Sequence, residues 1–197
     1  MADARSRYRN STRQINWLKA YYFARAAVSI VWVAATFTVG NTVPVIGNGL
    51  LVAYPAWDAI ANIADVQSNG GWKKNSTQVL NAAVSGVTTV AVAIALGVSM
   101  NAVLGVYGVW AALSGLFQLA TGVRRWKIYG AQWAMILSGA QSALAGAFFL
   151  KQASLAGAPG ISDIAPYAAF GAFYFLVSAL WLAVSDARRR RAQTAGA

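Results

Sequence analysis

The residues of this sequence that could do chemistry are a few polar side chains placed within long apolar runs. Asp58, Asn62 and Asp65 stand at positions i, i+4 and i+7, so they share one face if this run is a helix. Arg25 lies in the preceding run and Asn81 in the following one. Because an unpaired charge inside a membrane costs several kcal/mol, we expect Arg25 to pair with Asp65 or Asp58. Asn62 and Asn81 would complete the hydrogen bonds.

This polar cluster has three possible uses. It could be a structural latch that ties the first two apolar runs to the rest of the chain. It could be a proton or ion site, in which Asp58, beside the helix-bending Pro55, exchanges a proton with cytoplasmic water. It could also be a contact site for a larger membrane complex.

Other reactive groups are scarce. The chain contains no histidine and no cysteine, so thiol chemistry and most transition-metal ligation are excluded. No serine lies in a nucleophile-elbow context, and the glycines form no phosphate-binding loop. We therefore expect no catalytic residue, no metal, no cofactor and no enzymatic activity.

Composition indicates which elements must position the polar cluster. Hydrophobic residues make up 58% of the 197 residues, and charged residues only 11%, whereas a soluble domain carries about 25% charged residues. The net charge of +11 comes from short basic clusters between the apolar runs. That placement is typical of membrane-protein loops and argues against nucleic-acid binding. The fold class is therefore an all-α polytopic membrane bundle.

The apolar runs predict six membrane-spanning helices, each near the ~20 residues that a crossing requires. Short connections near Pro44 and near residues 99–101 predict two tight hairpins. The chain then divides into a basic cytoplasmic tail (1–19), a transmembrane domain (20–186) and a second basic tail (187–197). The six predicted spans cover about residues 20–41, 47–66, 79–98, 101–123, 130–150 and 164–185.

The positions of the basic residues predict the orientation. With six spans, both tails and every second loop lie on one side, and that side collects every lysine and arginine except Lys151 and Arg25. This bias predicts a bacterial inner-membrane protein with both termini in the cytoplasm. The residues expected at the cytoplasmic interface, where they would meet anionic lipid, are Trp17, Trp72, Lys73, Lys74, Arg124, Arg125, Trp126 and Lys127.

The chain also shows signs of an internal repeat. The letters AAVS occur at residues 26–29 and again at 82–85, and YPAW at 54–57 aligns with YGVW at 107–110. These correspondences predict three parallel helical hairpins as the repeating unit. The predicted hairpins are residues 20–67, 77–123 and 130–186.

Small residues recur at four-residue spacing in the fourth and fifth predicted spans. Such stripes let helix backbones approach closely inside a membrane. They could serve packing within the chain or homo-oligomerisation. The residues concerned are Gly108, Ala112 and Gly115 in the fourth span and Ser138, Gly139, Ser142 and Gly146 in the fifth.

Two motifs carry a family resemblance. One is W-x-x-x-S-G-x-x-Q-L-x-x-G-x-R-R at residues 110–125, and the other is W-x-M-I-L-S-G-x-x-S-x-L-A-G at residues 133–146. The chain resembles the HdeD-like family of short-repeat bacterial membrane proteins, whose founding member is associated with acid resistance and whose relatives mostly have no assigned activity. The resemblance implies packing motifs, not catalytic ones.

We therefore predict a non-enzymatic inner-membrane protein that acts in membrane stress or as an accessory subunit of a larger complex. The alternative is a small ion, proton or solute conduit that uses Arg25, Asp58 and Asp65. The expected partners are membrane lipid and either a second copy of the chain or a larger membrane-protein complex.

Overall fold

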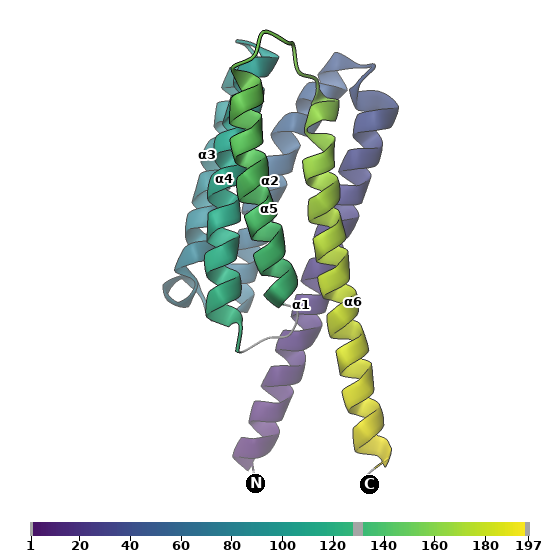
Figure 1. Cartoon of the computed structure of the whole chain (residues 1–197). Coiled ribbons are helices and arrows are strands. Elements are labelled where there is room, and N and C mark those ends of the chain that lie inside the picture. The colour runs from purple at the N-terminus through teal and green to yellow at the C-terminus, as the bar shows by residue number, and fades with distance from the viewer. Residues whose placement is uncertain (1, 128–131, 196–197) are drawn as a thin grey trace.

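A computed structural model describes residues 2–127 and 132–195 of the chain, with the side chains of residues 2–13, 190 and 192–195 left out. As predicted, the regular structure in these residues is all-α (Figure 1). Its elements in chain order are α1 (Ala2–Ala35), the π-helical turn η1 (Thr36–Gly40), α2 (Pro44–Ser68), η2 (Trp72–Lys74), α3 (Ser76–Ala95), α4 (Met100–Arg125), α5 (Gln132–Ala153), η3 (Ile161–Asp163) and α6 (Ala165–Ala195).

Five helical segments among the described residues are long and apolar enough to cross a membrane: Gln14–Gly40, Ser76–Ala95, Met100–Arg125, Gln132–Ala153 and Ile161–Arg189. Each contains most of one predicted span. Helix α2 has 25 residues but is not among these candidates. Asp58, Asn62 and Asp65 lie on this helix and reduce its mean hydropathy.

The first and last helices are longer than the sequence suggested. Helix α1 begins at Ala2, so most of the segment predicted as a tail is helical and continuous with the first span. Helix α6 runs to Ala195, beyond the predicted end at residue 185. The reason is that neither extension contains a proline or glycine that would stop a helix. The predicted start of the fifth span, Gly130, lies outside the described residues.

The helices form a closed ring. Each helix packs against the next one along the chain, and α1 packs against α6 to complete the circle. The most extensive contacts join α4 to α5, α1 to α6 and α2 to α3. Both chain ends, the end of α4 and the start of α5 lie at one end of the ring, here named the termini end (Figure 1).

Helices α4 and α5 approach closely because their facing residues are small. A Cβ atom added to Gly115 would lie 2.5 Å from the Ala143 nitrogen and 2.6 Å from the Gly139 oxygen. A Cβ atom on Gly146 would lie 2.5 Å from the Ala112 nitrogen and 2.6 Å from the Gly108 oxygen. The stripes that the sequence predicted therefore pack against each other within the chain, which is the first of the two uses considered for them.

Pro55 interrupts the backbone hydrogen bonds of α2 without ending the helix. A proline has no N–H, so it leaves the carbonyl of the residue four positions earlier, Leu51, without its usual donor. The Tyr107 hydroxyl of α4 donates to that carbonyl at 2.6 Å. Because Tyr107 and Leu51 are both buried, this bond fixes α4 against α2 at the position of the proline.

Candidate functional site

The interior of the ring contains a cavity lined mainly by polar and aromatic side chains, here named the chamber. Residues of all the α-helices, from α1 to α6, contribute to its wall. Its volume is about 100 Å³, above the ~10–15 Å³ that a cavity needs to hold a water molecule. It reaches from Arg125 near the termini end to Tyr54 and Tyr167 deeper in the ring.

Asp58 is the centre of the first polar cluster. Arg25 of α1 forms an ion pair with one of its oxygens, so one of the two expected partners is present. The other oxygen accepts hydrogen bonds from Asn62 at 3.0 Å, Asn81 at 3.2 Å and Ser85 at 2.7 Å. Asn62 and Asn81 thus lie where the sequence placed them. The carboxylate thereby connects α1, α2 and α3.

Ser85 extends this cluster to α4, and sequence reasoning did not identify it. Its hydroxyl donates to Asp58 and accepts from the Trp110 indole nitrogen at 2.9 Å. Ser85 follows Asn81 by four positions, so both lie on the same face of α3. That spacing was the available signal.

Arg25 also contacts aromatic side chains. Its Nη1 donates to the Tyr21 hydroxyl at 2.9 Å, and its guanidinium carbon lies 4.3 Å from the centre of the Phe175 ring. Such contacts stabilise a cation that has been removed from water. The Arg25 side chain is only 14% exposed, and that of its partner Asp58 is 9% exposed.

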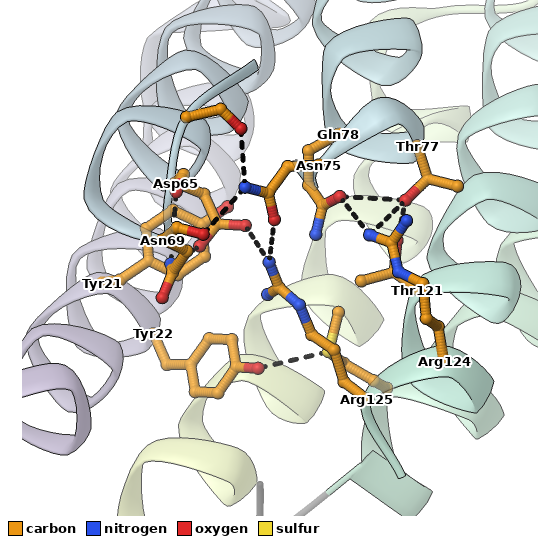
Figure 2. Close-up of polar contacts among 12 residues, drawn as sticks. Tyr21, Tyr22, Asp65, Asn69, Asn75, Thr77, Gln78, Thr121, Arg124 and Arg125 are labelled. Carbon is orange, nitrogen blue, oxygen red and sulfur yellow. Dashed lines mark hydrogen bonds and ion pairs between the residues drawn. The ribbon is translucent and has the colours of Figure 1, made fainter. Parts of the chain in front are cut away.

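Asp65 belongs to a second cluster and does not contact Arg25. Its partner is Arg125 of α4, at 3.3 Å, and Asn69 donates to its other oxygen at 2.6 Å (Figure 2). Arg125 also donates to Asn75 at 3.0 Å. The prediction that Asp65 would join the Arg25 cluster therefore differs from the structure, because Asp58 holds Arg25 and Asp65 lies two turns farther along α2, where Arg125 reaches it.

The placement of Arg125 corrects a second expectation. It was expected at the cytoplasmic interface, but its side chain is buried. Adjacent residues of an α-helix point about 100° apart. Figure 2 shows the result: Arg125 points toward Asp65 and Asn75, while Arg124 points toward Gln78 and Thr77.

The other residues predicted at the interface gather at the termini end. Trp72, Lys73 and Lys74 of η2 are exposed, as are Arg124, Trp126 and Lys127 after or at the end of α4. Trp17 of α1 is partly buried and stacks on Tyr21. This end of the ring thus presents exposed basic and aromatic side chains, as the water-facing boundary of a membrane protein does.

Several buried polar atoms of the chamber have no hydrogen-bond partner in the described part of the chain. The donors are the indole N–H of Trp57, the Nε–H of Arg25 and the amide N–H₂ of Gln78, and the Ser114 hydroxyl is also unpaired. The Asn81 oxygen is an unpaired acceptor. Sequence reasoning identified Arg25 and Asn81 but not Trp57, Gln78 or Ser114, since an isolated polar residue in a span usually bonds to a neighbouring helix.

The chemistry of the chamber is that of recognition by hydrogen bonds. Within residues 2–127 and 132–195 no three acidic side chains come together as a metal site would require. The charges present are paired as Arg25 with Asp58 and Arg125 with Asp65. What remains to interact with another molecule are an N–H of the charged Arg25 guanidinium, side-chain amides and hydroxyls that can both donate and accept, and aromatic rings.

Comparison with known proteins gives one match. Residues 80–151 match the model of a protein family described as "Short repeat of unknown function (DUF308)". The matched residues, less than half of the chain, are here named the DUF308 segment. The matched segment contains both motifs noted at residues 110–125 and 133–146, and it covers α4 and most of α3 and α5. No curated protein and no solved structure matches the chain.

The chamber combines residues from inside and outside the DUF308 segment. Asn81, Ser85 and Arg125 lie within it, whereas their partners Asp58 and Asp65 lie before it. Arg25 lies outside it as well. The polar clusters therefore join the DUF308 segment to helices that the match does not cover.

Proposed function

We propose that the chain is a non-enzymatic bacterial inner-membrane protein with six spans and both termini in the cytoplasm. Support comes from the five candidate spans and from the position of α2, which lies in the ring between α1 and α3. The termini end carries the basic clusters of the sequence, which favours a cytoplasmic location for it.

A three-fold hairpin repeat is part of the same proposal. The aligned positions Trp57 and Trp110 of α2 and α4 both line the chamber, as equivalent positions of a repeat would. The most extensive helix contacts, however, join one proposed hairpin to the next. The repeat would therefore describe the ancestry of the sequence and not separate packing units.

We propose further that the protein binds a small polar solute in the chamber and conducts it across the membrane. The observation that carries this proposal is the set of buried polar atoms left without partners: three N–H donors, a hydroxyl and an acceptor. A structural latch needs its donors and acceptors matched, because each unpaired group costs about 1–3 kcal/mol. The Asp58 carboxylate itself is fully hydrogen-bonded, but its partners Arg25 and Asn81 keep unpaired polar atoms, as do other residues of the chamber wall.

Solute flux into proteoliposomes tests this proposal. Stopped-flow light scattering would compare vesicles containing the protein with protein-free vesicles, using a panel of small solutes. Ser114→Ala removes an unpaired hydroxyl of the chamber, and Ser154→Ala is the control because that hydroxyl is exposed and bonds to Lys151. We expect vesicles with the protein to take up at least one solute faster than protein-free vesicles. Ser114→Ala should change that rate, and Ser154→Ala should leave it unchanged. Equal rates in protein-free vesicles for every solute would overturn the conduit.

A role as an accessory subunit is the second candidate, favoured by one observation. Helices α1 and α6 extend together past the other helices at the termini end (Figure 1), and Lys19 bonds to Asp186 at 2.7 Å between them. The sequence of both extensions is basic. Two projecting basic helices offer a surface for an acidic partner protein.

Native mass spectrometry of gently solubilised membranes tests the accessory role. A partner of fixed stoichiometry, lost when residues 1–13 are removed, would support it. The chain alone or with copies of itself would contradict it. The stress role that the HdeD-like resemblance implies would be tested separately, by survival of a deletion strain after acid challenge.

A further inference from the structure

Helices α3 and α4 meet at the termini end, where two candidate membrane spans stop. The spans are Ser76–Ala95 and Met100–Arg125. The hydroxyls of Thr77 and Thr121 bond to each other at 2.8 Å between the two helices. The residues that flank these span ends therefore lie at the boundary between hydrocarbon and water, which is the depth that phospholipid headgroups occupy.

Exposed basic and aromatic side chains gather at this boundary and are here named the basic patch. Its residues are Trp72, Lys73 and Lys74 of η2 and Arg124, Trp126 and Lys127 at the end of α4. Within the described residues, no carboxylate pairs with any of its lysines or its arginine. The patch thus keeps its full positive charge, and its tryptophans are of the residue type that is enriched at headgroup depth.

The η2 turn, which carries two of the lysines, is held in a fixed position against α4. The side chain of the buried Asn75 donates to the carbonyls of Asn69 and Gly71, both at 2.9 Å. The Asn75 oxygen accepts from Arg125 at 3.0 Å (Figure 2). The η2 turn and the end of α4 are therefore two parts of one surface.

Arg124 is held by uncharged partners and keeps donors for another group. Its Nη2 donates to the Thr77 hydroxyl at 3.1 Å and to the Gln78 oxygen at 2.9 Å. These bonds orient the guanidinium without neutralising its charge. The N–H groups of Nη1 and Nε bond to no described residue. A planar guanidinium with N–H groups to spare is a preferred partner of phosphate oxygens.

We propose that the basic patch binds the headgroup of an anionic phospholipid, with the phosphate on Arg124 and the lysines of η2 beside it. The acyl chains of this lipid lie against the outer faces of α3 and α4, where Leu80 and Val123 are exposed within a turn of the span ends. A zwitterionic lipid carries its own cation and gains less from the patch. None of the patch residues lines the chamber, so this inference goes beyond the proposed function and does not depend on it.

Thermal unfolding of the purified full chain in a neutral detergent tests the ligand. Phosphatidylglycerol is compared with phosphatidylcholine of the same acyl chains and with soluble glycerol phosphate, each at increasing concentration. We expect phosphatidylglycerol to raise the unfolding temperature at concentrations where the other two compounds do not. Equal stabilisation by phosphatidylcholine would overturn the proposal, because the charge of the headgroup would then not be recognised. Equal stabilisation by glycerol phosphate would overturn a lipid as the ligand.

Two matched double variants separate a defined site from a general attraction between acidic lipid and a basic protein. Lys73→Gln with Lys74→Gln removes two charges of the patch, and Arg188→Gln with Arg189→Gln removes two exposed charges from the end of α6. The first should weaken phosphatidylglycerol binding about thirtyfold, equivalent to ~2 kcal/mol, and the second less than about threefold. Equal losses would show that only net charge matters and would overturn the site.

Arg124→Gln provides a second test, which does not depend on the lysine turn. It removes the guanidinium that holds the phosphate and should weaken phosphatidylglycerol binding about tenfold, equivalent to ~1.4 kcal/mol. The unfolding temperature without lipid should change little, because Arg124 is exposed. An unchanged affinity for phosphatidylglycerol in this variant would overturn the proposal.

Discussion

Arg125 and Asp65, 60 residues apart in the chain, form a buried ion pair with 3.3 Å between Nη2 and Oδ2. Their side chains are 8% and 4% exposed. The pair joins the end of α4, inside the DUF308 segment, to the end of α2, outside it. It thus fixes the termini end of two helices that a membrane alone would leave free to slide.

Removing Arg125 should destabilise the protein strongly. Arg125→Ala leaves Asp65 buried with its charge unpaired, and loss of one member of a buried pair costs about 3–5 kcal/mol. Arg124→Ala is the matched control, since Arg124 is exposed and, within the described residues, bonds to the uncharged Thr77 and Gln78. Its cost should stay below about 1 kcal/mol. Unfolding in detergent measures both, and equal effects would show that the pair does not stabilise the fold.

The Arg25–Asp58 pair allows the structural and functional uses to be separated. Asp58→Leu alone leaves Arg25 unpaired and should cost about 3–5 kcal/mol. The double variant Arg25→Met with Asp58→Leu replaces both charges by apolar groups and should recover much of that loss. If the double variant folds but has lost solute flux, the pair has a functional role. Unchanged flux would assign it to the latch alone.

Gly115 should tolerate no side chain. Gly115→Ala places a methyl group 2.5 Å from the Ala143 nitrogen, so α4 and α5 must separate, at a cost of about 1–3 kcal/mol. Gly86 of α3 is the control, because a Cβ there meets nothing within 4 Å. Gly86→Ala should be neutral or stabilise the helix by up to about 1 kcal/mol. Equal unfolding temperatures for the two variants would contradict the close α4–α5 packing.

The loss of stability caused by Tyr107→Phe should depend on the presence of Pro55. Tyr107→Phe leaves the Leu51 carbonyl without a donor and should cost about 1–3 kcal/mol. Pro55→Ala supplies a backbone N–H that can bond to the same carbonyl. In the Pro55→Ala background, Tyr107→Phe should therefore cost less than ~1 kcal/mol. A double-mutant cycle on unfolding free energies measures this coupling, and additive effects would disprove it.

The sequence predicted the helices well and their rotation poorly. Helix positions follow from apolar runs, which directly reflect the length of a membrane crossing. Whether Arg124 or Arg125 faces inward depends on a rotation of about 100°, and both stand in the same basic stop sequence. Hydropathy does not distinguish them, so Arg125 was expected at the interface and lies instead in the interior.

The sequence also predicted the face of the helix on which the polar residues lie but not all of their partners. The i, i+4 and i+7 spacing correctly put Asp58, Asn62 and Asp65 on one face of α2, and all are buried. Seven residues of helix rise about 10 Å, which is too far for one arginine to serve both aspartates. The second arginine comes from α4, and its approach depends on how the ring closes, which a single helix pattern does not encode.

Helix α2 decides the topology, and the absence of native cysteine makes it testable. Thr42 and Lys74 are exposed residues on either side of α2. If α2 crosses the membrane, a membrane-impermeant maleimide should label Thr42→Cys in intact cells and Lys74→Cys only after permeabilisation. The exposed Leu155→Cys, beyond α5, is the control and should label like Thr42→Cys. Labelling of Thr42→Cys and Lys74→Cys from the same side would show that α2 does not cross. In that case the five remaining spans would overturn both the six-span proposal and the cytoplasmic location of both termini, because an odd number of crossings puts the two ends of a chain on opposite sides.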